Sequence, residues 1–506
     1  MFTAETRPAS AVRHTCASKP RQSIVRASVN GSRIADIPVI VRPGRRRSNG
    51  PIRSTLTGPP EARGTVSAMT GDAHDVTPDV APDATPDAGD GPLTGVRVLD
   101  LTRVLSGPHC TRMLADMGAE VIKVEPPAGD MTRFASPRIN GLSSYFVQQN
   151  AGKRNVSLDL DKPEALEVLL ALAERCDVVV ENFRAGVAAR MGIGYDAVAA
   201  RNPAIVYASI SGYGADGPWK HRRAYATVVG AETGLTKAQG EAYARSSARE
   251  EPHYANDPHS HADVYTGLEA ASAILAALFR RARTGTGTYV DVSMAQTMLY
   301  VNEHMHDHLW DGPVQADWIR SFGPGDYPVL TAGNGETVVI SGHPAERGTF
   351  DSFIAAIDRR DLAQDPRFVD VTARLENLTA LLDVFREWAH GMPDADAIER
   401  AMDRFRMATG KLRSARELCD TDWARERNVV ADVSDRGGGS LRIPNSPWKF
   451  SDMHVGVRGE PRYRGEDNHA VLTELLDLDA DAIRRLEDDG VLSSRLPASG
   501  RYPETS

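Results

Sequence analysis

Residues 96–125 read VRVLDLTRVLSGPHCTRMLADMGAEVIKVE, and this stretch decides the fold. It begins with a short apolar strand over 96–101, turns at Ser106-Gly-Pro108, and continues with helical spacing over 109–117. Gly118 ends that helix, and a second apolar strand follows over 120–125. A strand, a helix and a strand joined by short turns predict a parallel sheet of the doubly wound α/β class.

The same alternation continues along the chain. It predicts helices over 163–176 and 264–283 and strands over 178–180, 205–210 and 289–292. Ligands of such sheets bind at the carboxyl ends of the strands. The loops Thr102–Gly107, Glu181–Gly186 and Ser211–Gly214 follow three of these strands, so we expect them to converge on one crevice.

A less hydrophobic, mixed α+β region follows. Helical spacing extends from Met294 to about Trp310 and recurs over 350–357, 378–388, 397–403 and 481–487. Residues 325–430 are therefore predicted to form a second, smaller domain.

Composition limits the classes of protein to consider. The chain has 506 residues, is 41% hydrophobic and carries a net charge of -9, which suits two or three globular domains and disfavours a nucleic-acid binder. We find no apolar run of the ~20 residues that a membrane span needs. The four cysteines form no CxxC pair, which favours a reducing, cytoplasmic location.

The N-terminal residues differ from the rest. Residues 1–70 hold twelve Lys/Arg and three Asp/Glu, whereas residues 71–92 hold six Asp, no basic residue and recurrent Pro. Residues 1–92 are predicted to be a disordered extension. It could be an organelle transit peptide, a tail for nucleic acid or membranes, or sequence upstream of a true start at Met69; we favour the last.

Dinucleotide binding is disfavoured. The first loop, TRVLSGP, has one glycine where a dinucleotide site needs G-x-G-x-x-G. The later Gly285-Thr-Gly-Thr288 follows a long helix and precedes a strand, so it is interpreted as the turn that ends the helix.

Two histidine clusters raise a metal-dependent hydrolase as an alternative. His259 and His261 have H-x-H spacing, and His304, His306 and His308 are expected on one helix. No HExxH glutamate accompanies them, so we predict no metal and consider His261 a candidate lining residue of the substrate pocket.

The resemblance to known proteins spans about residues 93 to 495, and several blocks carry it in the same order. They read DLTRVLSGPHCTRMLADMGAEVIKVEPP (100–127), NAGKRNVSLDL (150–160), DVVVENFRAGVAARMGIGYD (177–196), IVYASISGYGADGP (205–218), ADVYTGLEAASAILAALFRRARTGTGTYVDVSM (262–294) and IPNSPWKFS (443–451). The chain resembles the class III CoA-transferases of CaiB/BaiF type, the group of formyl-CoA transferase, carnitine CoA-transferase and alpha-methylacyl-CoA racemase.

This resemblance implies an architecture. A Rossmann-like large domain would bind CoA and comprise residues 93–310 and 435–506, with the small domain of residues 325–430 between them. It also implies a homodimer of interlocked rings. The expected partners are therefore an acyl-CoA, a carboxylic acid and a second copy of the chain, with no nucleic acid and no membrane.

The resemblance also implies a mechanism in which CoA moves between an acyl-CoA and a carboxylic acid through an aspartyl anhydride and an aspartyl-CoA thioester. The matching residue is Asp263, which directly precedes the predicted helix of residues 264–283. There the unpaired amides and the helix dipole should favour its ionised form. Without the resemblance, Asp263 would be interpreted as a simple N-cap.

The positions that match CoA contacts of the family, with CoA as a substrate and no tightly bound cofactor, are Val104, Leu105, Ser106, Leu158, Asn182, Phe183, Arg184, Arg190, Arg223 and Tyr225. Arginine suits phosphate because its planar fork donates paired hydrogen bonds. Tyr225 and Ala226 stand where the racemase branch carries a His and an Asp. Since a racemase needs a second acid/base, this departure favours transfer over the alternative of racemisation or isomerisation.

Overall fold

The computed structural model describes residues 91–246, 251–313 and 327–496. The predictions of a disordered extension over 1–92 and of a start at Met69 fall almost wholly outside these residues.

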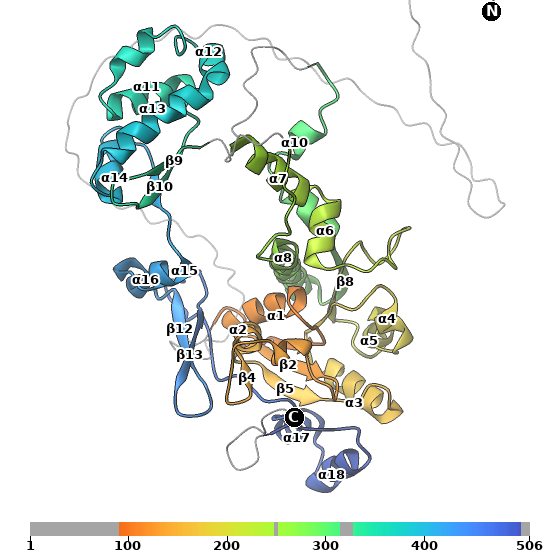
Figure 1. Ribbon diagram of the computed structural model, residues 1–506. Coiled ribbons are helices and arrows are strands. Elements are labelled where there is room, and N and C mark those ends of the chain that lie inside the picture. The colour runs from red at the N-terminus through yellow and green to blue at the C-terminus, as the bar shows by residue number, and fades with distance from the viewer. Residues whose placement is uncertain (1–90, 247–250, 314–326, 497–506) are drawn as a thin grey trace, which may run out of the picture. The chain divides into compact units, whose positions relative to one another are not determined.

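A six-stranded parallel sheet organises the fold (Figure 1). Its strand order is β5-β2-β1-β6-β7-β8. The strands are β1 (Arg97–Asp100), β2 (Glu120–Glu125), β5 (Arg154–Ser157), β6 (Val178–Glu181), β7 (Val206–Ser211) and β8 (Thr288–Ser293). The doubly wound α/β class predicted from residues 96–125 is confirmed.

The central strands are buried on both faces. Every residue of β6 and β7 is buried, and Val98 pairs with Val178 while Leu99 pairs with Val179. Such continuous apolar strands are typical of parallel sheets covered by helices on both sides.

Two groups of helices cover the sheet. One face packs against α1 (Ser106–Asp116) and α8 (His261–Thr284) around Val98, Val180 and Ile274. The opposite face, around Leu99 and Ile122, is covered by the helices α3 (Pro163–Glu174), α5 (Tyr195–Arg201), α17 (Asn468–Leu476) and α18 (Ala480–Asp488). The C-terminal segment thus completes a core that begins near residue 97.

Helix α8 is the longest in the described chain. It ends at Gly285, which has a φ of +69°, so the interpretation of Gly285–Thr288 as a helix-ending turn is confirmed. Helix α8 is long and apolar enough to cross a membrane by length and composition alone, although the sequence was expected to contain no run of that kind. Buried core helices pass the same test, and α8 packs against α1 and the sheet.

One prediction of local structure is wrong, and one strand of the sheet was not predicted. The helix expected from Met294 to Trp310 is two helices, α9 (Met294–Tyr300) and α10 (Met305–His308). Between them the side chain of Asn302 accepts a hydrogen bond from the backbone of His304, a local turn that competes with the helix. Strand β5 was not expected, because RNVS is short and half polar.

Residues 327–413 contain a second hydrophobic core. Its members include Leu330, Phe353, Phe385 and Ile398. The elements are β9 (Val329–Thr331), β10 (Thr337–Ile340), β11 (Thr409–Lys411), α11 (Arg347–Ala356), α12 (Val371–Glu376), α13 (Leu378–His390) and α14 (Ala395–Asp403), with a 3-10 turn at Arg360–Gln364. The domain boundaries predicted at 310–325 and 430–435 stay predictions.

The remaining elements lie in connections. They are β3 (Arg138–Ile139), β4 (Leu142–Ser143), α2 (Ser144–Asn150), α4 (Val187–Arg190), α6 (Ala226–Glu232), α7 (Leu235–Ser246), α15 (Ala415–Cys419), α16 (Asp422–Arg427), β12 (Val430–Ser434), β13 (Ser440–Pro444) and a 3-10 turn at Met131–Phe134. The hairpin β12–β13 packs its Val433 and Ile443 with Val147 of α2 in a small separate core.

Candidate active site

The strand order creates a crevice at the centre of the sheet. From β1 the chain runs outward through β2 to β5, then returns to β6 and continues in the opposite direction to β8. The loops that follow β1 and β6 therefore diverge, and this switch point is where doubly wound sheets bind ligands. A cleft of about 540 Å³ lies there and is lined by residues of the loops after β1, β6 and β7. The convergence predicted for these three loops is confirmed.

Eight of the residues singled out in the sequence line this one cleft. They are Val104, Ser106, Asn182, Phe183, Arg184, Arg223, Tyr225 and Asp263. The sequence distance from Val104 to Asp263 exceeds 150 residues, and the sheet topology brings them together.

Three other predicted CoA contacts lie outside the lining. Leu105 is the buried N-cap residue of α1. Leu158 is fully buried in the core beside α3 and bridges to Leu492. Arg190 is the last residue of α4. Contacts of these residues with CoA stay predictions.

Asp263 lies inside the first turn of α8, at its third residue, rather than before the helix as expected. The side chain and the backbone N–H of Ser106 face this carboxylate and favour its ionised form. Burial nevertheless raises the pKa of Asp263 from 3.8 to about 6, and the Ser106 groups oppose this rise only in part. The expected lowering by the helix terminus is therefore outweighed by desolvation, although the group is still mainly ionised at pH 7.

The contact between Ser106 and Asp263 depends on a close approach of α1 to α8. Gly267 lies within α8 and faces the first turn of α1. A Cβ atom at Gly267 would lie 2.7 Å from the carbonyl oxygen of Ser106 and 3.2 Å from the Cβ of His109. Only glycine allows the two helices to meet at this distance.

Side chains after β6 fix the other wall of the cleft. Asn182 Nδ2 donates to the carbonyl of Arg103 and also reaches Ser106 Oγ at 3.4 Å. The backbone N–H of Phe183 donates to Glu181 at 2.7 Å, and the guanidinium of Arg103 lies 5.5 Å from the centre of the Phe183 ring. Burial raises the pKa of Glu181 to about 7.

The cleft is strongly basic. Its lining contains Arg103, Arg184, Lys220, Arg222 and Arg223 but, among the described residues, only the carboxylate of Asp263. Arg222 pairs with Glu232 and lies over the ring of Trp219, 4.4 Å from its centre. Such a surface suits a ligand with several negative charges. Sequence reasoning did not select Arg103 or Lys220, although Arg103 lies within the loop that was expected at the crevice.

Tyr225 stands at the entrance of α6 as its N-cap residue and is 62% exposed. Because it lines the cleft, the position at which the racemase branch carries its histidine is indeed in the site.

The histidines of the two clusters form hydrogen bonds with residues close to them in the sequence. The ring Nδ1 of His261 lies 2.9 Å from Asp257 Oδ2, and the same carboxylate accepts the backbone N–H groups of His259 and His261. His304 is the N-cap residue of α10 rather than a member of a helix face shared with His308. In the described ranges no group of three or more potential ligands could hold a metal ion.

Comparisons with known proteins agree with this geometry. The family model described as CoA-transferase family III matches residues 93–468. Formyl-CoA:oxalate CoA-transferase of Streptomyces coelicolor is 32% identical over 426 residues, which cover 79% of this chain and 99% of that protein. Succinyl-CoA:mesaconate CoA-transferase of Haloarcula hispanica is 31% identical, covering 76% of this chain and 96% of its own length.

A mammalian relative and a solved structure extend the comparison. Succinyl-CoA:glutarate CoA-transferase of Mus musculus is 29% identical, covering 79% of this chain and 90% of that protein. The crystal structure of a CAIB/BAIF family protein from Brucella suis superposes with a TM-score of 0.65 and 28% identity, covering 76% of this chain and all of that one.

Proposed function

The chain belongs to CoA-transferase family III and is an enzyme that transfers CoA, and we propose that it does so through covalent intermediates on Asp263. The single observation that carries this proposal is the placement of the Asp263 carboxylate in the wall of the basic cleft, held by Ser106. A half-buried carboxylate with a pKa of about 6 is ionised at pH 7 and more nucleophilic than one in water.

The reaction proceeds in four balanced steps. A carboxylate oxygen of Asp263 attacks the thioester carbonyl of the acyl-CoA, the C–S bond breaks, and CoA leaves as a thiolate with a mixed anhydride on Asp263. The thiolate then attacks the aspartyl carbonyl, which forms aspartyl-CoA and releases the donor carboxylate. The acceptor carboxylate attacks this thioester, giving a second anhydride and the thiolate. Attack of the thiolate on the acceptor's acyl carbon gives the new acyl-CoA and free Asp263.

The basic lining supports the choice of substrate. CoA carries several phosphate charges, and the cleft places Arg184, Lys220 and Arg223 around the same space as Asp263. The relatives named above act on oxalate, mesaconate and glutarate, all dicarboxylates. We therefore propose a dicarboxylate as the acceptor, and competition among dicarboxylates and monocarboxylates of equal length tests it. A preference for monocarboxylates would overturn this choice.

Trapping tests the mechanism. Incubation with acyl-CoA and hydroxylamine should convert Asp263 to a hydroxamate, which peptide mass spectrometry locates, and Asp263→Ala should abolish CoA exchange. Glu269→Gln is a control on the same helix, because Glu269 is absent from the cleft lining. Full exchange by Asp263→Ala, or label on another residue, would refute the nucleophile. Solvent deuterium entering the α-carbon of the acyl group would instead support a racemase.

We also propose a homodimer. Large apolar side chains are exposed on α8 and α9 and just beyond α10, with Phe279 67%, Tyr300 81% and Leu309 71% exposed. Such exposure marks surfaces that pack against another chain. Light scattering of the purified protein should give twice the chain mass; a monomer at micromolar concentration would contradict the proposal.

A further inference from the structure

The loop between β1 and α1 contains a residue in an unfavourable backbone conformation. Val104 has a φ of +70°, and among the residues that the structure describes it is the only β-branched one with positive φ. A branched Cβ makes this region costly, so the conformation persists only where surrounding contacts impose it. Val104 also lines the cleft, two residues before Ser106.

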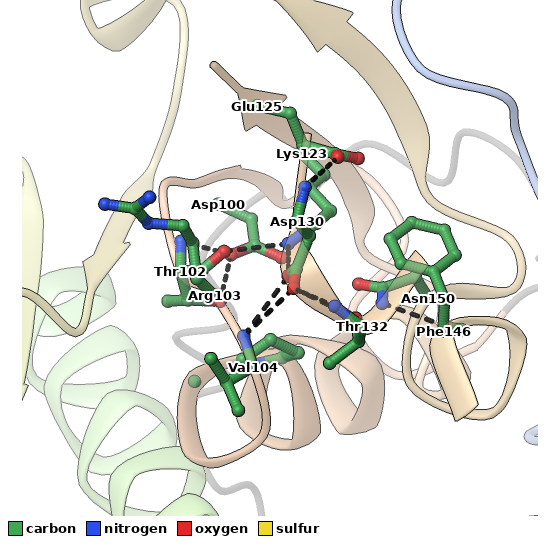
Figure 2. Close-up of polar contacts among 12 residues, drawn as sticks. Asp100, Thr102, Arg103, Val104, Lys123, Glu125, Asp130, Thr132, Phe146 and Asn150 are labelled. Carbon is green, nitrogen blue, oxygen red and sulfur yellow. Dashed lines mark hydrogen bonds and ion pairs between the residues drawn. The ribbon is translucent and has the colours of Figure 1, made fainter. Parts of the chain in front are cut away.

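Asp130 holds Val104 in this conformation (Figure 2). The backbone N–H of Val104 lies 3.2 and 3.4 Å from the two oxygens of the Asp130 carboxylate. That carboxylate is fully buried and also accepts the backbone N–H and the hydroxyl of Thr132. Asp130 follows β2 by five residues, so it reaches the loop from the neighbouring strand.

Lys123 holds the other end of the same loop. Its ammonium is fully buried, donates to the carbonyl of Thr102 at 2.7 Å and lies 3.4 Å from Asp130 Oδ2. Burial alone would lower the pKa of Lys123, but the carboxylates of Asp100 and Asp130 reverse the effect and raise it. The ammonium is therefore charged, and Figure 2 shows it beside Asp130 and the loop that contains Thr102.

The restraints lead directly to the proposed nucleophile. Thr102 and Val104 are fixed, Leu105 is the N-cap of α1, and Ser106 is its first residue. Ser106 and Asp263 both line the cleft, and the N–H and hydroxyl of Ser106 are the groups that favour the ionised Asp263 carboxylate. A shift of the loop would therefore move both donors away from the carboxylate.

We propose that Asp130 and Lys123 are positioning residues for CoA transfer, which fix the loop of residues 102–105 so that Ser106 meets the Asp263 carboxylate. The inference rests on the proposed function, because it concerns the same nucleophile. A buried ion pair is retained here for the conformation that it imposes on Val104, not for net stability alone.

Asp130→Asn and Lys123→Met test the proposal, with Asp116→Asn as the matched control. Asp116 is also buried and lies 3.4 Å from a cation, Arg112, but at the far end of α1. We expect kcat to fall about 10-fold or more in the first two variants, since small misplacements at a reacting group cost this much. The kcat of the Asp116→Asn control should stay within about 3-fold of the wild-type value.

The pH profile separates positioning from a loss of folded protein. Weakened Ser106 bonds should raise the acid limb of kcat/KM by about one pH unit in the two variants and not in the control. Burial, and after it the negative charges of Asp263 and Asp130, raise the pKa of Tyr145 in α2. The cations that share the cleft with Asp263 are Arg103, Arg184, Lys220, Arg222 and Arg223.

Rescue and amide exchange complete the test. Glycine adopts positive φ freely, so Val104→Gly added to Asp130→Asn should recover part of the lost kcat. Hydrogen exchange of the peptide 101–110 should speed up in Asp130→Asn and Lys123→Met only, a readout independent of the role of Asp263. Unchanged exchange and an unchanged acid limb in both variants would overturn the proposal. Activity in Asp263→Ala would refute the nucleophile alone.

Discussion

The carboxamide of Asn182 exchanges two hydrogen bonds with the backbone of Arg103. The N–H of Arg103 donates to Asn182 Oδ1, and Asn182 Nδ2 donates to the carbonyl of Arg103, both at 2.8 Å. One side chain after β6 thus ties down the loop after β1, across the point where the strand order reverses.

Asn182→Asp should weaken binding of acyl-CoA. The aspartate keeps the acceptor but places a carboxylate against the carbonyl of Arg103, so we expect KM to rise about 10-fold, because that carbonyl loses its donor and faces a negative charge. Asn202→Asp is the control, because Asn202 Nδ2 similarly donates to the carbonyls of Ala173 and Cys176, away from the cleft. Initial-rate kinetics should show a raised KM in the first variant only; equal KM values would contradict the role of Asn182.

Gly267→Ala should separate α1 from α8. The added methyl group would lie 2.7 Å from Ser106 O, so we expect a loss of about 1–3 kcal/mol in the free energy of unfolding, as in other overpacked cores, together with lower kcat. Gly348→Ala in α11 meets nothing within 4 Å and should be neutral or slightly stabilising. Denaturant titration and steady-state rates check both; wild-type behaviour of Gly267→Ala would disprove the close contact.

Activity should fall on the acid side at the pKa of Asp263. The nucleophile must be ionised, and burial raises its pKa to about 6, so kcat/KM should drop tenfold per pH unit below that value. A profile measured between pH 4.5 and 8 checks this, with circular dichroism to confirm that the enzyme stays folded. An acid limb near pH 4 would show that the group is not desolvated.

Glu181 should make stability depend on pH. Burial raises its pKa from 4.5 to about 7, so between these values the folded protein binds a proton that the unfolded chain has lost. Stability therefore falls as pH rises through this window, by up to about 3 kcal/mol. Glu181→Gln lacks the titration and should gain stability relative to the wild type from pH 5 to pH 8. A constant difference in Tm across that range would argue against it.

Much of the α/β fold could be predicted because it depends on local patterns. The strands β2, β6 and β7 are short runs rich in β-branched and other apolar residues, and their bounds match the prediction to within a residue. Strand β5 escaped notice because its stability comes from pairing with β2 rather than from its own residues. The break between α9 and α10 depends on one asparagine side chain, which has no periodic signature.

In the site, too, features set by local sequence patterns could be predicted, whereas features set by tertiary contacts could not. Loops that follow strands were identified, and Asp263, Asn182 and Arg184 lie where the topology required. The rise in the pKa of Asp263 was not foreseen, because desolvation depends on the approach of α1, which Gly267 permits. Asp130 and Lys123 had no motif to reveal them. The cytoplasmic location stays a prediction.

The core on the α3 side of the sheet has a consequence for how the chain is made. Leu99 and Ile122 share this core with Val471, Ile483 and Leu492, residues that the ribosome adds more than 340 positions later. Until these arrive, only α3 and α5 cover this side of the nascent sheet, and its core is incomplete. The first strand is therefore fully buried only after residues up to 492 have been synthesised, so this enzyme should depend on chaperones during synthesis.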